Sequence, residues 1–252
     1  MSNEFPNPYP KSIEYDFFNN IPPSPLPSIT PFPLSNNYGV VFERIPQKLY
    51  NELDLQIKSV LNPQTTNIKV NQNLIGHIEK EFDLNPSLEM SNYIKNLSQK
   101  YSTIFPYEIN SITNKITPTE KKVNTPQPPL LNKIEYDLSS LWVNIQEKHE
   151  YNPLHHHAGL YSFVIWHYIP YQMLDELQMG PGKAISKETN HNGKFQFFSP
   201  NRNNIISTDI PIDKKWNGMV GIFPSWLNHQ VNPFFSSDEY RITVAGNVFL
   251  KV

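Results

Sequence analysis

Three histidines offer the clearest chemistry in this sequence. His155 and His157 lie one residue apart in Asn152-Pro-Leu-His-His-His, and His229 opens a strand-like segment after Phe223-Pro-Ser-Trp-Leu-Asn. Alternate residues of a strand point to one face, so His155 and His157 could bind one metal ion together. A third imidazole from a distant strand completes a set that suits iron, copper or zinc. The alternative is a solvated histidine loop and an ordinary core histidine.

A basic residue is predicted to face the same interior. Arg241 opens the apolar segment 241–250 and shares a strand face with Thr243. A buried guanidinium needs a partner, and a ligand carboxylate would supply one through a bidentate pair, with Thr243 donating a further hydrogen bond. On this strand alone, a surface arginine paired with Asp238 or Glu239 is an equal alternative.

The first half of the chain must support that site rather than form it. Residues 1–37 include nine of the 24 prolines and are predicted to form an extended arm without helix or strand pairing, because proline lacks an N–H donor. Residues 38–132 are predicted to be a helical support region with an insertion. Its helices are expected after Pro46 and after Ser87, which is a candidate N-cap.

Residues 133–252 are predicted to form the catalytic core, and 38–252 one compact unit. About eight short strands, separated by turns and without regular intervening helices, favour an antiparallel sandwich or barrel. The clearest strands are expected at 141–145, 161–169, 194–198, 219–223 and 241–250, with shorter ones near 155, 205 and 229. The one long connection, 171–193, is a candidate lid.

Composition excludes several classes of function. The chain of 252 residues has no cysteine, so thiol catalysis, disulfides and cysteine-bound zinc are excluded. A net charge of −2 gives no broad positive field for nucleic acid. The N-terminus lacks the pattern of a signal peptide, and no segment has the apolar length of a membrane span. We therefore expect a cytoplasmic protein, in the host cytoplasm if it is viral.

Taken in order, the motifs resemble the iron- and 2-oxoglutarate-dependent dioxygenases, and within them the prolyl-4-hydroxylase-like group common in bacteriophage genomes. The resemblance covers roughly residues 38–252 and is sharpest over 141–250. The motifs are Asn152-x-x-His155-x-His157, Ser162-Phe-Val-Ile-Trp, Lys194-Phe-Gln-Phe-Phe-Ser-Pro, Phe223-Pro-Ser-Trp-Leu-x-His229 and Arg241-Ile-Thr-Val-Ala-x-Asn247. Their order is more specific than any one of them.

The resemblance implies a mainly β fold with flanking helices, the double-stranded β-helix, a jelly-roll or cupin-like barrel. It implies Fe(II) as the metal, with 2-oxoglutarate and O₂ as cosubstrates and ascorbate as a supportive reductant. His155 matches the first metal ligand and His229 the distal one. Arg241 and Thr243 match the residues that bind the far carboxylate of 2-oxoglutarate, and Asn144 lies where relatives place another polar contact.

The implied reaction is hydroxylation of an unidentified substrate, a peptide or small molecule, with succinate and CO₂ as co-products. Peptidyl proline is the substrate by analogy only.

One position departs from the family pattern. His157 occupies the place of the usual Asp or Glu ligand, which leaves the site with one more positive charge. A working three-histidine oxygenase is the preferred interpretation. A carboxylate from elsewhere, such as Asp209 or Asp213, or a metal site without oxygenase activity are the alternatives. Two other classes also stay open: a three-histidine cupin-type metalloenzyme that does not use 2-oxoglutarate, and a non-catalytic jelly-roll virion or adaptor protein.

Overall fold

The computed structural model describes residues 26, 28–62, 76–107, 109, 134–181, 189–201 and 203–251. Most of the expected proline-rich arm, most of the insertion before 133 and the middle of the expected lid lie outside them. The elements, in chain order, are β1 (Ile29–Pro33), β2 (Gly39–Arg44), α1 (Gln47–Leu61), β3 (Lys80–Asp83), α2 (Leu88–Ile104), β4 (Glu135–Gln146), β5 (Asn152–His155), β6 (Tyr161–Tyr168), α4 (Met173–Glu176), β7 (Phe195–Asn201), β8 (Asn204–Ile210), η4 (Lys214–Trp216), β9 (Met219–Pro224), β10 (Asn228–Val231) and β11 (Arg241–Lys251).

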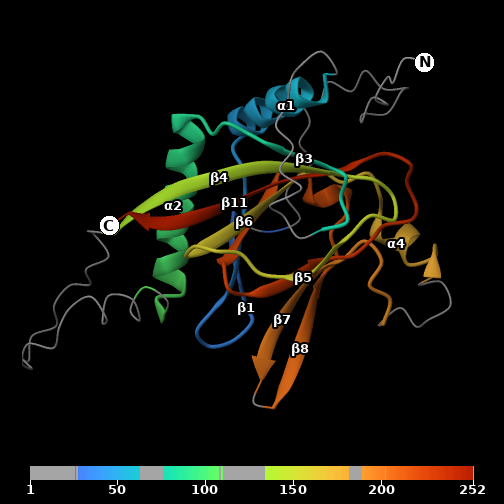
Figure 1. Cartoon of the computed structure of the whole chain (residues 1–252). Helices are drawn as coiled ribbons and strands as arrows, with labels where there is room; N and C mark the ends of the chain where they lie inside the picture. Colours follow the sequence, from blue (N-terminus) through green and yellow to red (C-terminus); the bar gives the residue numbers. More distant parts are fainter. Residues whose placement is uncertain are drawn as a thin grey trace, which may run out of the picture.

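The strands form two antiparallel sheets (Figure 1). The larger sheet has the order β1-β2-β9-β6-β11-β4-β3, and the smaller has the order β5-β10-β7-β8. The eight strands from β4 to β11 are divided evenly between the two sheets, with β1, β2 and β3 extending the larger one. This is the double-stranded β-helix, and the expected mainly β fold with flanking helices is confirmed.

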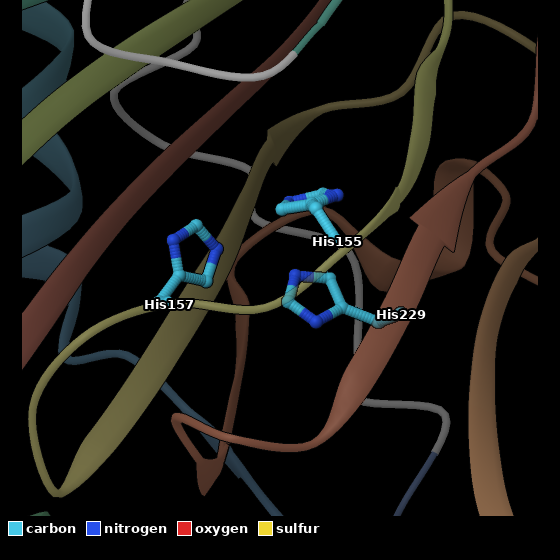
Figure 2. A group of neighbouring side chains, drawn as sticks. All are labelled: His155, His157 and His229. Carbon is cyan, nitrogen blue, oxygen red and sulfur yellow. The ribbon is translucent and has the colours of Figure 1, made fainter.

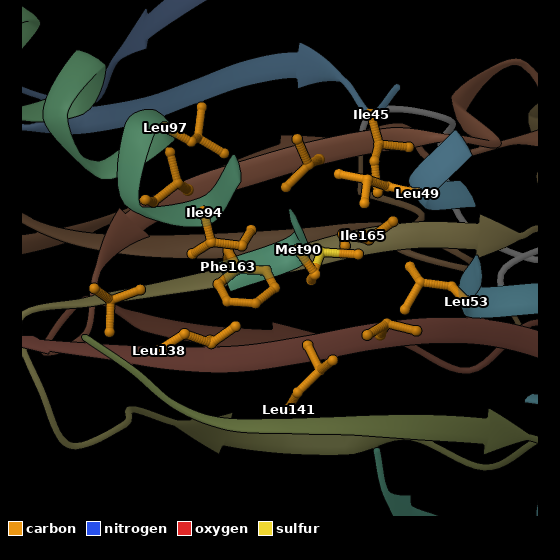
Figure 3. Packing of buried hydrophobic residues seen from close by; sticks show 14 of the residues in the cluster. Ile45, Leu49, Leu53, Met90, Ile94, Leu97, Leu138, Leu141, Phe163 and Ile165 are labelled. Carbon is orange, nitrogen blue, oxygen red and sulfur yellow. The ribbon is translucent and has the colours of Figure 1, made fainter. Parts of the chain in front are cut away.

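Helices α1 and α2 cover the outer face of the larger sheet. Figure 3 shows Leu49 and Leu53 of α1 and Ile94 of α2 meeting strand residues such as Phe163 in one apolar cluster. Helix α2 begins where expected, since the Ser87 hydroxyl accepts a hydrogen bond of 3.0 Å from the Met90 amide. Within the described part of the chain, no helix has the length and apolar character needed to cross a membrane.

Pairing across the larger sheet arranges polar residues in rows. Strand β11 pairs with β4 so that Arg241 lies opposite Gln146 and Thr243 opposite Asn144. Strand β3 pairs with the other side of β4 and places Glu81 opposite Asn144. The alternate residues of β11 pack into the helix-covered cluster. The polar rows therefore face the inside of the barrel, toward the smaller sheet.

Two strands differ from the sequence expectation. Residues 29–33 were expected to lie in an unpaired arm, but they pair with β2 as β1, with Pro31 opposite Val41. Proline is tolerated there because β1 is the edge strand of its sheet, and an edge strand can turn its missing N–H outward. Strand β3 was not predicted at all. It is short and carries three charged residues, yet pairing with β4 buries Lys80 and Glu81.

The described ends of the long connection 171–193 are fixed to the barrel. The Glu176 side chain of α4 is fully buried and accepts hydrogen bonds from the Phe235 and Ser236 amides, both at 2.8 Å, and from the Ser236 hydroxyl. The Asn192 amide donates to the carbonyls of Glu176 and Met179. The proposed lid is thus limited to residues between these fixed ends.

We expect Glu176→Ala to destabilise the protein by about 2–4 kcal/mol, because it leaves two partly buried amides without their acceptor and empties a buried side-chain position. Denaturant unfolding would measure the loss. Asp175→Ala on the same helix, where the side chain is exposed, is the matched control. Equal stability of the two variants would contradict this role of Glu176.

Candidate metal centre and its cavity

The three predicted histidines converge in space. His155 ends β5, His157 follows it by two residues, and His229 lies on β10 directly opposite His155 in the strand pairing. One ring nitrogen from each lies within 4.8 Å of the others. Figure 2 shows the three rings turned toward one another, with ring centres 4.3–5.1 Å apart. Three nitrogens at this separation could bind one metal ion.

Hydrogen bonds orient two of these rings. The Nδ1 of His155 lies 2.6 Å from the Pro153 carbonyl, and the Nδ1 of His229 lies 2.9 Å from the Leu227 carbonyl. A carbonyl only accepts, so each Nδ1 carries the proton and each Nε2 keeps a free lone pair. Phe195 stacks on His229 at 5.4 Å and 9°. Backbone carbonyls that fix the ring tautomer in this way are typical of metal-binding histidines.

Burial keeps the three imidazoles neutral. It is the largest cause of the lowered pKa of all three, and the neighbouring histidines lower them further. The pKa of His157 falls to about 3. Neutral imidazole is the form that binds metal, so the cluster is ready for a cation near pH 7.

The same shifts predict an acid-sensitive metal-free protein. The unfolded chain takes up protons on these histidines below about pH 6.5, whereas the folded cluster does not, so stability is lost as the pH falls below that value. Denaturant midpoints measured in chelator at pH 7.5 and 5.5 test this. Between pH 7.5 and 5.5, we expect the free energy of unfolding of His157→Gln to fall by about 1 kcal/mol less than that of the wild type. Equal losses would contradict the prediction.

A cavity of about 280 Å³ lies beside the histidines, between the two sheets. Its wall includes every residue predicted for the site. Those residues are Asn144, His155, His157, His229, Arg241 and Thr243, and the wall also contains Glu81, Gln146 and Trp166. The sequence therefore predicted correctly that the arginine and the histidines share one interior.

Arg241 is buried and makes five hydrogen bonds to neutral groups. Its Nε and one terminal nitrogen donate to the Gln146 side-chain oxygen at 3.0 and 2.7 Å. Other bonds reach the Tyr171 hydroxyl at 2.7 Å, the Gly193 carbonyl at 3.2 Å and the Asn232 carbonyl at 2.7 Å. No acidic side chain among the described residues forms an ion pair with it. Its charge is therefore held in place without a protein anion.

The surface alternative for Arg241 is wrong. Asp238 pairs with Lys148 at 2.8 Å, and Glu239 accepts a hydrogen bond from Tyr168. The guanidinium itself is only 2% exposed. A buried cation that faces a cavity and has no anionic partner is a suitable site for a ligand carboxylate.

Asn144 and Thr243 form the row next to Arg241. The Asn144 amide donates to the Thr243 hydroxyl oxygen at 3.3 Å. The other side-chain atom of Asn144, its Oδ1, is buried and has no hydrogen-bond partner. Asn144 is 7% exposed and lines the cavity. An unused acceptor on the cavity wall indicates that a donor is missing from the site.

The sequence did not point to Gln146, Tyr171 or Glu81. Gln146 and Tyr171 hold Arg241, and their convergence depends on contacts 95 and 70 residues apart in sequence. Glu81 is 2% exposed, and burial, followed by the nearby Glu150 carboxylate, raises its pKa to about 7. The only signal in the sequence would have been an acid alternating with apolar residues near 78–82.

The two carboxylates considered as substitute metal ligands lie elsewhere. Asp209 binds Lys194 at 2.8 Å and Gln196 at 2.7 Å. The Asp213 side chain accepts from the Lys215 amide and caps η4. Neither lines the cavity, so the structure gives no support to a carboxylate supplied from these positions.

Several solved structures are similar to this chain. The chain is similar to a prolyl-4-hydroxylase from Pseudomonas putida, with 11% identity, 85% of this chain and 94% of that chain covered, and a TM-score of 0.47. It is also similar to a prolyl hydroxylase from Trichoplax adhaerens, solved with a peptide fragment of the hypoxia inducible factor oxygen degradation domain. The identity to this second enzyme is 12%, the match covers 86% of this chain and 84% of that chain, and the TM-score is 0.42. The search of curated proteins gives no match.

Residues 140–247 match the model of a family described as "Putative 2OG-Fe(II) oxygenase". This segment contains β5, β6 and β10, the three histidines and Arg241. This segment is similar to the 2OG-Fe(II) oxygenases, and the match supports an enzyme of the dioxygenase class. Enzymes of this class use Fe(II), 2-oxoglutarate and O₂, and the neutral, converging histidine nitrogens fit an Fe(II) ion.

Proposed function

We propose that the protein hydroxylates its substrate with Fe(II) and 2-oxoglutarate, and that His155, His157 and His229 bind the iron. The observation that carries this proposal is the convergence of three neutral imidazoles beside a buried arginine that has no anionic partner. The protein would provide two of the three histidines with their Nε2 already directed at the metal. His157 would supply the third nitrogen, where the family pattern has a carboxylate.

Arg241 and Thr243 would bind the far carboxylate of 2-oxoglutarate, with Asn144 beside them. The guanidinium already donates all its hydrogen bonds, so a carboxylate must replace one of its acceptors. The Gln146 oxygen is the best candidate for release, because it belongs to a side chain and accepts from both nitrogens that a bidentate carboxylate would use. Gly193 and Asn232 use backbone carbonyls, and the Tyr171 hydroxyl is itself held by the Gly193 carbonyl. A charge-assisted bidentate pair is about twice as strong as the neutral bonds that it would replace.

The cofactor set supplies the oxidation, in which 2-oxoglutarate becomes succinate and CO₂ and an oxygen atom enters the substrate. The contribution of the chain is to orient the cosubstrate and to exclude water. Trp166, Phe195 and Phe223 form apolar parts of the cavity wall and limit access of water to the metal face. Peptidyl proline remains the substrate that the motif resemblance suggests.

The test is turnover by the purified protein. With Fe(II), ascorbate and 2-oxoglutarate we expect quenching of tryptophan fluorescence on cosubstrate addition, and slow succinate formation in the absence of substrate. Trp166 lies in the cavity wall and would report the quenching. A protein that binds Fe(II) but shows neither response would contradict the proposed use of 2-oxoglutarate.

A further inference from the structure

The cavity is lined by a carboxylate, that of Glu81, as well as by the Arg241 guanidinium. Glu81 of β3, Asn144 of β4 and Thr243 of β11 form one row across three neighbouring strands. Strands are spaced about 4.8 Å apart, so Glu81 lies roughly 10 Å across the sheet from β11, which carries Arg241. The two charged residues therefore lie on the same inner face of the larger sheet, two strands apart, and both line the cavity beside the histidines.

The Glu81 carboxylate has no protein partner within the described residues. The adjacent cation, Lys80, points to the opposite face of β3 and binds Glu147 and Tyr240. Buried acids are normally paired or hydrogen-bonded, and burial of an unpaired carboxylate costs free energy. The Asn144 Oδ1 in the same row is also an acceptor without a donor. Two acceptors that face the cavity from one row favour a ligand with hydrogen-bond donors.

The other components of the site do not satisfy these acceptors. The Glu81 carboxylate does not belong to the group of ligand atoms within 4.8 Å of one another, so it does not share the histidine metal position. 2-Oxoglutarate is a dianion, which Glu81 would repel and Arg241 attract. A Ca²⁺ site built from protein oxygens needs six to eight of them, and this row offers one carboxylate and one amide oxygen.

We propose that Glu81 binds a cationic nitrogen of the substrate, an ammonium or guanidinium group, on the cavity wall two strands away from Arg241. This inference rests on the proposed function, because it assigns to the substrate the part of the cavity left by iron and 2-oxoglutarate. Asn144 accepts a second hydrogen bond from the same group. The substrate class is therefore a basic amino acid, a peptide with a basic side chain, or another small amine.

The test compares two probes of the same length. N-acetyl-lysine methylamide carries the ammonium group, and N-acetyl-norleucine methylamide ends in a methyl group instead. We expect the wild type, loaded with Fe(II) and 2-oxoglutarate without oxygen, to bind the lysine probe at least ~10-fold more tightly in calorimetry, as expected for a hydrogen bond to a charged group. In Glu81→Gln the preference should fall to less than ~3-fold.

Glu79→Gln, the same change at an exposed position of the adjoining segment, is the matched control and should keep the preference. Glu81→Asp keeps the negative charge and should retain part of the preference for the lysine probe. Equal binding of both probes by the wild type, binding of neither, or full preference in Glu81→Gln would overturn the proposal.

Failure of the probe-binding test can be distinguished from failure of the proposed oxygenase function. Succinate formation without substrate tests use of 2-oxoglutarate and does not depend on Glu81. Titration of both probes into the metal-free protein tests Glu81 without any turnover. If the wild type shows no preference for the lysine probe but still forms succinate, the substrate class alone is rejected. If the wild type prefers the lysine probe but forms no succinate, the oxygenase assignment alone is rejected.

Discussion

His229→Ala is expected to abolish tight binding of Fe(II) and all succinate formation. His229 is the most deeply buried member of the cluster at 3% exposure, and its partner across the strand pair is His155. Its loss leaves two imidazoles on one side of the metal position. Changes to residues that only support metal ligands already weaken binding 10–100-fold, so we expect loss of a ligand to exceed ~100-fold. Calorimetric titration with Fe(II) under nitrogen measures this directly.

Two matched variants separate coordination from general damage. His191→Ala removes a histidine that pairs with Asp209 outside the cavity, and its metal affinity should equal that of the wild type. His156→Ala and His157→Ala are neighbours with opposite predicted effects, since only His157 belongs to the converging group. If the His156 variant loses as much affinity for Fe(II) as the His157 variant, the assignment of His157 as the second metal ligand is wrong.

Arg241→Ala is expected to raise the KM for 2-oxoglutarate by more than ~100-fold while Fe(II) binding persists. The change removes a charge-assisted bidentate pair, and hydrogen bonds to charged groups contribute about 1.5–3 kcal/mol each. Arg241→Lys keeps the charge but loses the planar geometry, so an intermediate KM is expected. Arg44→Ala, which removes a guanidinium that binds the Asn217 carbonyl and does not line the cavity, should leave the KM unchanged.

Arg241→Ala also removes donors from Gln146, Gly193 and Asn232, so its melting temperature should fall. Fe(II) titration then shows whether the histidine cluster is still assembled. Metal-dependent turnover that is indifferent to 2-oxoglutarate and to this substitution would identify instead a three-histidine enzyme that works without this cosubstrate.

The sequence predicted most of what depends on short-range periodicity. The alternation of strand residues was enough to place Arg241 with Thr243 and His155 with His157, because this period fixes which side chains share a face. The first turns of α1 and α2 followed from Pro46 and from the Ser87 cap. His229 was proposed as the third ligand from its position at the start of a distant strand, and the resemblance then supported this choice.

What the sequence did not predict depends on long-range pairing. Strand β3 has only four residues, two of them acidic, and its local pattern is that of an exposed segment. Only pairing with β4 gives Glu81 its place on the cavity wall. The strand at Pro31 was missed for a related reason, since proline disfavours a strand unless that strand lies at the edge of a sheet. Edge position is a property of the assembled sheet.

Arg241 joins four parts of the chain that are distant in sequence: the end of β4 at Gln146, and the segments at Tyr171, Gly193 and Asn232. Tyr171 and Gly193 are the two ends of the long connection that contains α4, and they are also bonded to each other. A diacid that replaces the Gln146 oxygen would hold the guanidinium more firmly against the two ends of this connection, because Arg241 keeps its bonds to Tyr171 and Gly193. Amide hydrogen exchange around Gly193 should report cosubstrate occupancy from outside the metal site, without any need for turnover.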